Sequence, residues 1–172
     1  CGLGDVYKRP VLLAGGTPVI AETSFATNYK RTAGKLEGAI TPKTKWFIFN
    51  SPSNPTGAGY NWDELKALTD VLLRHPHVWV MSDDMYEHLA YGDFKFCTPA
   101  EVEPALYDRT LTCNGVSKAY AMTGWRIGYI MCANQEAINQ FIKIQYYITA
   151  CSNDAMQYAV LTAFDEASDY PD

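Results

Sequence analysis

Short apolar runs that stop at turn residues alternate with helical patterns along this chain, and this alternation does most to narrow its possible folds. Residues 45–50 form such a run, and two prolines and a glycine keep residues 51–57 out of regular structure. The same reasoning predicts strands at residues 77–81, 110–113 and 126–132, and helices at residues 135–148 and 153–164. Strands that alternate with helices are typical of an α/β fold, so we expect a doubly wound, mostly parallel sheet flanked by helices.

A helix with a clear start follows the first loop. Asn61 can cap it, and Glu64, three residues later, can bond back to the Asn61 backbone as in a capping box. Residues 74–76 include a proline and should end the helix. Its apolar face is expected to consist of Leu65, Leu68, Leu72 and Leu73.

The first residues fit this scheme less well. Residues 11–13 predict a strand, whereas residues 1–10 follow neither a helical nor a strand period. We therefore interpret residues 1–10 as a leader that does not match, followed by one domain over residues 11–172. We also expect the chain to be a piece of a longer protein.

Composition and charge argue against several classes of function. The chain has a formal net charge of −5 and no block of lysine and arginine, which argues against nucleic-acid binding. No apolar run approaches the roughly 18 residues that a transmembrane helix needs. The five cysteines show neither a CxxC motif nor histidines at metal-ligand spacing. We therefore expect no metal site, no membrane partner, and free thiols in a reducing cytoplasm.

Polar side chains follow three of the predicted strands. Asn54, Asp83 and Lys118 each come just after the end of a different apolar run. Ligands of open α/β sheets bind at the carboxyl ends of the strands. We therefore expect these three residues to converge on one site.

Lys118 and Arg126 suggest the chemistry of that site. Lys118 lies in residues 115–128, Gly-Val-Ser-Lys-Ala-Tyr-Ala-Met-Thr-Gly-Trp-Arg-Ile-Gly. An amine can form a Schiff base with an aldehyde, and a guanidinium fork matches phosphate oxygens, to which Ser117 could add a hydroxyl. Pyridoxal 5′-phosphate (PLP) is the cofactor that needs both groups. Singly, Lys118 would more often be a solvated lysine and Arg126 a strand-edge residue in a surface ion pair.

Three further residues could hold the cofactor ring. The carboxylate of Asp83 can keep the proton on a pyridine nitrogen, although the adjacent Asp84 competes for this assignment. Tyr86 can donate a hydrogen bond to the phenolic oxygen of the ring, which the amide of Asn54 could also reach. Alone, these residues would more often be a turn acid, a core tyrosine and an Asx-turn residue.

Together, residues 50–57, 78–86 and 115–128 resemble the class I (fold type I) PLP-dependent aminotransferases, especially the bacterial aspartate aminotransferases. The likeness runs from about residue 11 to residue 164. It implies part of a large cofactor-binding domain, amino transfer between an amino acid and a 2-oxo acid, with aspartate and 2-oxoglutarate as the expected pair, and a cytoplasmic homodimer.

The resemblance also implies a role for each site residue. Lys118 would hold the cofactor and move the proton between the substrate Cα and the aldehyde carbon. Asp83 would pair with the pyridine nitrogen, and Tyr86 with Asn54 would hold the phenolic oxygen. Arg126 would bind the phosphate. Some relatives carry a phosphate-binding serine three positions before the lysine, where this chain has Gly115.

Other interpretations remain open at this point. Family members also have an N-terminal phosphate loop and a C-terminal small domain that grips the substrate carboxylate, so we expect residues 1–172 to be inactive alone. A carbon–sulfur lyase, another amino-acid aminotransferase or a non-catalytic PLP-sensing regulator domain would share the same lysine. A dinucleotide-binding module is disfavoured because no G-x-G-x-x-G follows a first strand.

Overall fold

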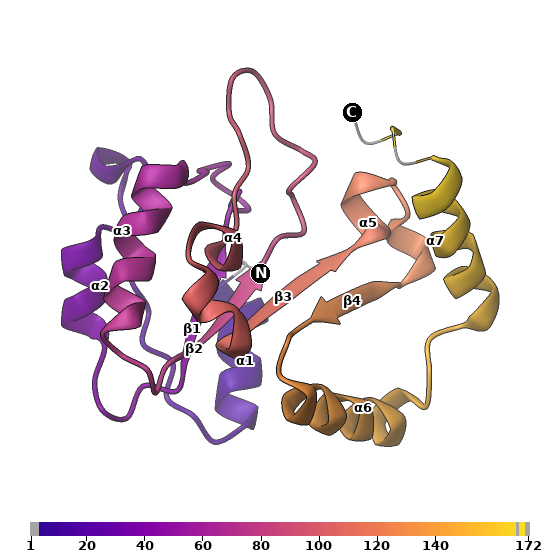
Figure 1. The fold of residues 1–172 in the computed structure, drawn as a ribbon, viewed down its shortest axis with the longest axis horizontal. Coiled ribbons are helices and arrows are strands. Elements are labelled where there is room, and N and C mark those ends of the chain that lie inside the picture. Colours follow the sequence, from indigo (N-terminus) through magenta and orange to yellow (C-terminus); the bar gives the residue numbers. More distant parts are fainter. Residues whose placement is uncertain (1–3, 168, 171–172) are drawn as a thin grey trace.

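A four-stranded sheet forms the centre of the computed structural model, which describes residues 4–167 and 169–170 (Figure 1). The strands lie side by side in chain order, with the first three parallel and the last antiparallel to its neighbour. They are β1 (Trp46–Asn50), β2 (Trp79–Asp83), β3 (Thr110–Gly115) and β4 (Gly128–Met131). The mostly parallel sheet flanked by helices that the sequence predicted is confirmed.

Helices lie on both flanks of the sheet, with α2 and α3 beyond β1 and α6 and α7 beyond β4 (Figure 1). The α-helices are α1 (Gly4–Leu13), α2 (Ala33–Ala39), α3 (Trp62–Leu73), α4 (Pro99–Val102), α5 (Val116–Ala119), α6 (Gln135–Thr149) and α7 (Asp154–Glu166). Short 3₁₀ helices are η1 (Phe25–Thr27), η2 (Pro104–Arg109) and η3 (Thr123–Trp125). The expected helices at 135–148 and 153–164 are therefore confirmed as α6 and α7. Within the described residues, no helix combines the length and apolar character that crossing a bilayer requires.

The predicted start of α3 is confirmed. The Asn61 side chain accepts a hydrogen bond from the Glu64 backbone, and the Glu64 carboxylate accepts one from the Asn61 backbone, both at 2.9 Å. These bonds satisfy N–H groups that have no partner within the first turn of a helix. Lys30 also binds the Glu64 carboxylate, at 2.7 Å, and ties the preceding segment to the start of α3.

The apolar face of α3 was predicted with one error. Leu65, Leu68 and Leu72 are each 1% exposed, as expected, but Leu73 is 38% exposed. Successive residues of an α-helix are separated by roughly 100°, which turns Leu73 away from the sheet. Val71, which was not predicted, is buried instead at 2% exposure.

One apolar core lies between the sheet and the helices α2, α3 and α4. Val78, which directly precedes β2, and Val80, within β2, are fully buried in this core. Full burial of such a side chain contributes roughly 1.5–3 kcal/mol, so this core holds β2 firmly. The other buried members are Leu36, Phe49, Tyr60, Leu65, Leu68, Val71, Leu72, Cys97, Val102 and Leu106.

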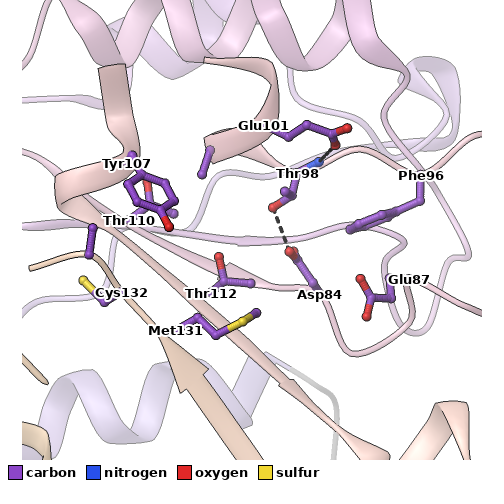
Figure 2. A pocket seen from close by; sticks show the side chains of 12 residues that line it. Asp84, Glu87, Phe96, Thr98, Glu101, Tyr107, Thr110, Thr112, Met131 and Cys132 are labelled. Carbon is purple, nitrogen blue, oxygen red and sulfur yellow. Dashed lines mark hydrogen bonds between the residues drawn. The ribbon is translucent and has the colours of Figure 1, made fainter. Parts of the chain in front are cut away.

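Strand β2 begins and ends two residues later than residues 77–81, the prediction from the sequence. Ser82 lies just beyond the predicted strand, but it is fully buried and its hydroxyl donates to the Asp84 carboxylate at 2.5 Å. Thr98 donates to the other Asp84 oxygen at 2.7 Å (Figure 2). Polar residues could continue the strand because these partners satisfy them. Asp83 is therefore the last residue of β2 and does not follow it.

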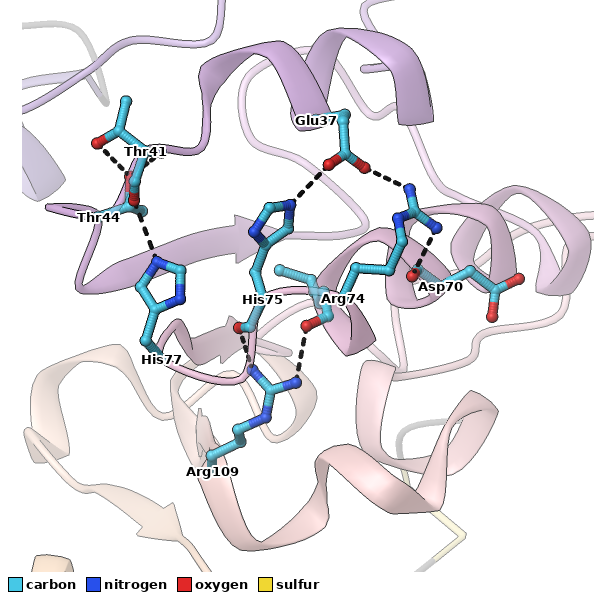
Figure 3. Close-up of polar contacts among 9 residues, drawn as sticks. Glu37, Thr41, Thr44, Asp70, Arg74, His75, His77 and Arg109 are labelled. Carbon is cyan, nitrogen blue, oxygen red and sulfur yellow. Dashed lines mark hydrogen bonds and ion pairs between the residues drawn. The ribbon is translucent and has the colours of Figure 1, made fainter.

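Arg109 fixes the connection between α3 and β2. Its guanidinium donates to the carbonyl oxygen of His75 at 3.1 Å (Figure 3). It also donates to the carbonyl oxygen of Leu72 at 2.8 Å and to that of Val78. The last carbonyls of a helix have no partner within the helix, so this arginine supplies the missing donors. On the outer side, Glu37 of α2 binds Arg74 and contacts His75 Nε2 at 2.7 Å (Figure 3).

The strand predicted at residues 11–13 is wrong. One helix, α1, spans Gly4–Leu13, so it includes these residues together with residues 4–10, for which neither a helix nor a strand was predicted. Tyr7 and Val11, four residues apart, are half-buried on one helix face, whereas Leu12 is 53% and Leu13 is 89% exposed. The apolar run at residues 11–13 therefore does not mark a buried strand.

The predicted strand at residues 126–132 is also corrected. Strand β4 begins at Gly128, because Arg126 has a left-handed backbone with φ of 57° and caps η3. Such a conformation cannot continue a strand. Arg126 thus belongs to a turn that precedes β4 and does not begin the strand.

Candidate active site

Three of the predicted site residues gather around one phenol ring. The Asn54 amide donates to the Tyr86 hydroxyl oxygen at 2.7 Å, and the Lys118 Nζ lies 5.7 Å from the centre of the Tyr86 ring. All three side chains are half-buried. Asn54 follows β1, Tyr86 follows β2 and Lys118 follows β3. Neighbouring parallel strands thus bring an amide, a phenol and an amine together at their carboxyl ends.

Asp83 lies at the same edge of the sheet, between Asn50 of β1 and Cys113 of β3. The Asn50 amide donates to the Asp83 carbonyl at 2.9 Å, and its oxygen accepts from the Asn54 backbone at 3.1 Å. Asn50 therefore links the loop with Asn54 to the strand with Asp83. It was missed as a site residue, although an amide at the end of an apolar run before a proline-rich loop was a visible signal.

Tyr7 of α1 is a second residue that the sequence did not reveal. Its hydroxyl donates to the Asp83 carboxylate, and the other Asp83 oxygen accepts from the Met85 backbone at 3.3 Å. Burial raises the pKa of Tyr7, and the bond to Asp83 and the charge of Asp83 raise it further. Asp83 therefore holds an N–H or O–H donor in this position. The sequence gives no signal for Tyr7, because residues 1–10 follow neither a helical nor a strand period.

Asp84 points to the opposite face of the sheet from Asp83. It is 2% exposed and lies in a pocket of about 330 Å³, on the side of α4 (Figure 2). Burial raises the pKa of Asp84 to about 6, although the hydroxyl donors Ser82 and Thr98 act in the opposite direction. The pocket is lined by Asp84, Glu87, Phe96, Thr98, Ala100, Glu101, Tyr107, Thr110, Thr112, Met131, Cys132 and Ala133. The two adjacent carboxylates thus serve different environments.

The raised pKa of Asp84 predicts a pH dependence of stability. The group favours its protonated form in the folded chain, with a pKa of about 6 against 3.8 as the ordinary value. The contribution of protonated Asp84 to the free energy of unfolding is complete below pH about 4 and is lost as the pH rises through 6. The loss amounts to about 3 kcal/mol. Asp84→Asn should remove this decline, as urea unfolding from pH 4 to 7 will measure. Asp93→Asn, at an exposed loop position, is the control and should keep it. Equal slopes for Asp84→Asn and the unaltered protein would contradict the prediction.

Apolar packing of Val116 anchors the segment that carries Lys118. Val116 begins α5, is fully buried, and packs with Ile127 and with Val160 of α7. The Tyr120 backbone donates to the Val116 carbonyl at 3.1 Å and closes the turn around Lys118. The lysine side chain therefore extends from a fixed backbone.

Gly115 explains why this chain has no serine three positions before the lysine. A Cβ atom there would lie 2.9 Å from the Ile127 carbonyl oxygen and 3.1 Å from Gly128 Cα. Gly115→Ser should therefore destabilise the protein by about 1–3 kcal/mol, since a packed backbone cannot give way easily. Thermal unfolding measures this, with Gly34→Ser as the control because a Cβ at Gly34 meets nothing within 4 Å. Equal stability of the two variants would refute tight packing at Gly115.

The two predicted phosphate ligands differ in placement. Ser117 lies next to Lys118 in α5 and is half-buried. Arg126 is exposed, and its guanidinium donates to the Thr123 carbonyl of its own turn at 3.0 Å. Arg126 also lines a second pocket, of about 440 Å³, with residues of η3 and of the segment from α6 to α7. The contacts therefore join Lys118, Tyr86 and Asn54. The Arg126 guanidinium instead bonds within its own turn and lines a different pocket.

Comparison with known proteins decides the family. Residues 5–171 match the family described as aminotransferase class I and II. The chain belongs to this aminotransferase family. Its members work with PLP. The chain is 58% identical over 164 residues to the aspartate/prephenate aminotransferase of Cereibacter sphaeroides, covering 95% of this chain and 41% of that protein.

Solved aminotransferase structures share the fold. The aspartate aminotransferase of Rhizobium meliloti is 47% identical with a TM-score of 0.93, and the match covers 97% of this chain and 42% of that one. The Thermus thermophilus aspartate aminotransferase with maleate is 37% identical with a TM-score of 0.87, covering 95% and 41% of the two chains. The chain thus spans less than half the length of these relatives.

The site residues fit the groups of PLP. An aldehyde needs an amine, which Lys118 offers from a half-buried position. A ring nitrogen that carries a proton needs an acceptor, and the Asp83 carboxylate already accepts an O–H in the structure. A phenolic oxygen needs a donor. Because the Tyr86 oxygen accepts from Asn54, the Tyr86 hydrogen can point to another acceptor.

Proposed function

We propose that this protein transfers an amino group between an amino acid and a 2-oxo acid, with PLP bound to Lys118. One observation carries the proposal: the Lys118 amine lies over the Tyr86 ring, whose oxygen is bonded to Asn54, at the strand end that holds Asp83. Membership of the aminotransferase family supports it.

Each residue has a distinct task in this proposal. PLP, when bound, supplies an aldehyde that takes up amines and a ring that accepts electrons. Lys118 Nζ would hold the aldehyde carbon and, when free, would carry the proton of the substrate Cα. The Asp83 carboxylate keeps a proton on the ring nitrogen, and the Tyr86 hydroxyl donates to the phenolic oxygen. Ser117 and Arg126 bind the phosphate.

The proposed substrates are aspartate and 2-oxoglutarate. Two observations favour dicarboxylates: similar proteins of Rhizobium meliloti and Thermus thermophilus are named aspartate aminotransferases, and the Thermus structure was solved with maleate, a four-carbon dicarboxylate. A second candidate acceptor is prephenate, because the relative that is 58% identical is named an aspartate/prephenate aminotransferase.

The test uses the protein expressed from its complete reading frame, because the chain spans about 41% of its relatives. A lysine-bound cofactor should give a visible or near-ultraviolet band that borohydride removes. Oxaloacetate should then form from aspartate with 2-oxoglutarate, and separately with prephenate. A colourless protein that binds no PLP would refute the proposal. A bound cofactor that releases a thiol when a sulfur-containing amino acid replaces aspartate would instead favour a lyase, and one that turns over no amino acid would favour a regulator.

We further propose a homodimer in the cytoplasm. The dimer rests on the family likeness and is tested by light scattering of the complete protein. The reducing location is supported by four free thiols among the described residues, Cys97, Cys113, Cys132 and Cys151.

A further inference from the structure

A part-buried hydrogen-bonded bridge connects the end of β3, just before the lysine segment, to Glu87. The Asn114 amide donates to Glu87 Oε1 at 2.6 Å, and the Asn114 oxygen accepts from the Gly115 backbone at 2.7 Å. Asn114 is only 5% exposed. Both ends of its side chain are therefore engaged, one by a carboxylate and one by the residue that begins the lysine segment. Such a charge-assisted bond is stronger than one between neutral groups.

The bridge joins the turn after β2, which carries Tyr86, to the end of β3, which leads into the segment with Lys118. Glu87 follows Tyr86 in the turn after β2, and its backbone donates to the Asp84 carbonyl at 2.9 Å. Asn114 lies near the end of β3, four residues before Lys118. Met85 of the first turn also packs close to Gly115, since a Cβ atom added to that glycine would lie 3.2 Å from Met85 Cε. The turn that carries Tyr86 thus contacts the end of β3 twice, through the hydrogen bond from Asn114 to Glu87 and through the packing of Met85 against Gly115.

The bridge lies on the sheet face opposite Asp83. Side chains alternate between the faces of a strand, so Asn114 shares a face with Thr112, which lines the Asp84 pocket together with Glu87. Figure 2 shows Glu87 beside Asp84 in that pocket. Glu87 therefore contacts the strand that leads into the lysine segment through Asn114, from the face opposite Asp83.

We propose that Glu87, acting through Asn114, is a positioning residue that sets Lys118 against Tyr86. This inference rests on the proposed function. Lys118 must reach both the aldehyde carbon and the substrate Cα, and a displacement of about 1 Å can lower a rate on the order of 100-fold. The bridge prevents such a displacement because it ties the two turns together without occupying the site.

Glu87 also faces other charged or titratable groups. His88 Nε2 lies 3.2 Å from the same Oε1 and is exposed, while Asp84 and Tyr129 interact with Glu87 electrostatically. An ion pair with His88 is thus the competing explanation for any effect of Glu87. His88→Ala separates the two, since it removes that pair and leaves the bond to Asn114.

The experiment exchanges donor and acceptor in the complete protein. Glu87→Leu removes the acceptor, and Asn114→Asp sets two carboxylates against each other. We expect both to lower kcat roughly 10- to 100-fold with little change in KM, and to shift the pH midpoint of the visible band of the lysine-bound cofactor. Glu87→Gln keeps an acceptor and should behave like the unaltered protein. The double variant Glu87→Gln with Asn114→Asp restores a donor and an acceptor, and should regain most of the rate and the midpoint.

Several outcomes would overturn the inference. If Glu87→Leu and Asn114→Asp lower the melting temperature but leave the band midpoint and kcat unchanged, the bridge is only structural. A defect reproduced by His88→Ala would assign the effect to the ion pair. Should the disruptive variants fail to fold, Glu87→Asp replaces them, because its side chain is one methylene shorter and places the acceptor farther from Asn114. The pH midpoint of the visible band must then differ from that of the unaltered protein. An unaltered protein without a band that borohydride removes would refute the proposed function itself, whereas an unshifted band refutes only the role of Glu87.

Discussion

Lys118→Ala should abolish the covalent bond to the cofactor and lower kcat on the order of 10⁴-fold, because in the proposed function one amine both holds the aldehyde and moves the proton. The fold should survive, since the anchor of this segment is the buried Val116 and the lysine is only half-buried. Borohydride reduction followed by peptide mass spectrometry measures the result. In the unaltered protein the reduced adduct should lie on the peptide that contains Lys118.

Two further variants test whether the amine of Lys118 itself is required. Lys118→Arg keeps a positive charge at the same position but cannot bond the aldehyde, so it should fail as Lys118→Ala does. Lys143→Ala changes an exposed lysine of α6 and should leave the adduct and the rate intact. An adduct that persists in Lys118→Ala would show that the reactive amine lies elsewhere.

Asp83→Asn should leave PLP bound but slow proton abstraction from the substrate Cα. Removing one partner of a buried charge pair costs about 3–5 kcal/mol. If that loss falls on the barrier, kcat falls roughly 10²- to 10⁴-fold. Proton abstraction then becomes the slowest step, so Cα-deuterated aspartate should show a larger isotope effect than with the unaltered protein.

Asp84→Asn is the matched control for this experiment. It removes the adjacent carboxylate, which faces the α4 side and is bonded to Ser82 and Thr98. Its kcat should stay close to that of the unaltered protein, even though its stability changes with pH in a different way. An Asp83→Asn variant with an unchanged rate would assign Asp83 to structure alone.

The sequence predicted the sheet and its helices because their signals are local. The apolar run at residues 45–50 and the pair Asn61 and Glu64 each specify a structure within a few residues. The clustering of Asn54 and Lys118 was predictable for a related reason. Parallel neighbouring strands end at the same edge, so residues that follow them meet there without further information.

The structural features that could not be predicted depend on contacts with other residues, some of them far away in the sequence. Ser82 looks like the end of a strand until Thr98 and Asp84 complete its network. Tyr7 reaches Asp83 across 76 positions of the sequence, and no local pattern encodes that contact. The left-handed backbone of Arg126 could not be predicted either, because arginine rarely adopts this conformation.

Two adjacent aspartates at the end of β2 make this site sensitive to strand alignment. A slip of β2 by a single position would exchange Asp83 for Asp84 or Ser82 and turn every side chain to the other side. It would also move Val78 and Val80, now fully buried in the core, to the face that presents Asp83. The packing of these two valines therefore determines which of the two aspartates faces the proposed cofactor site.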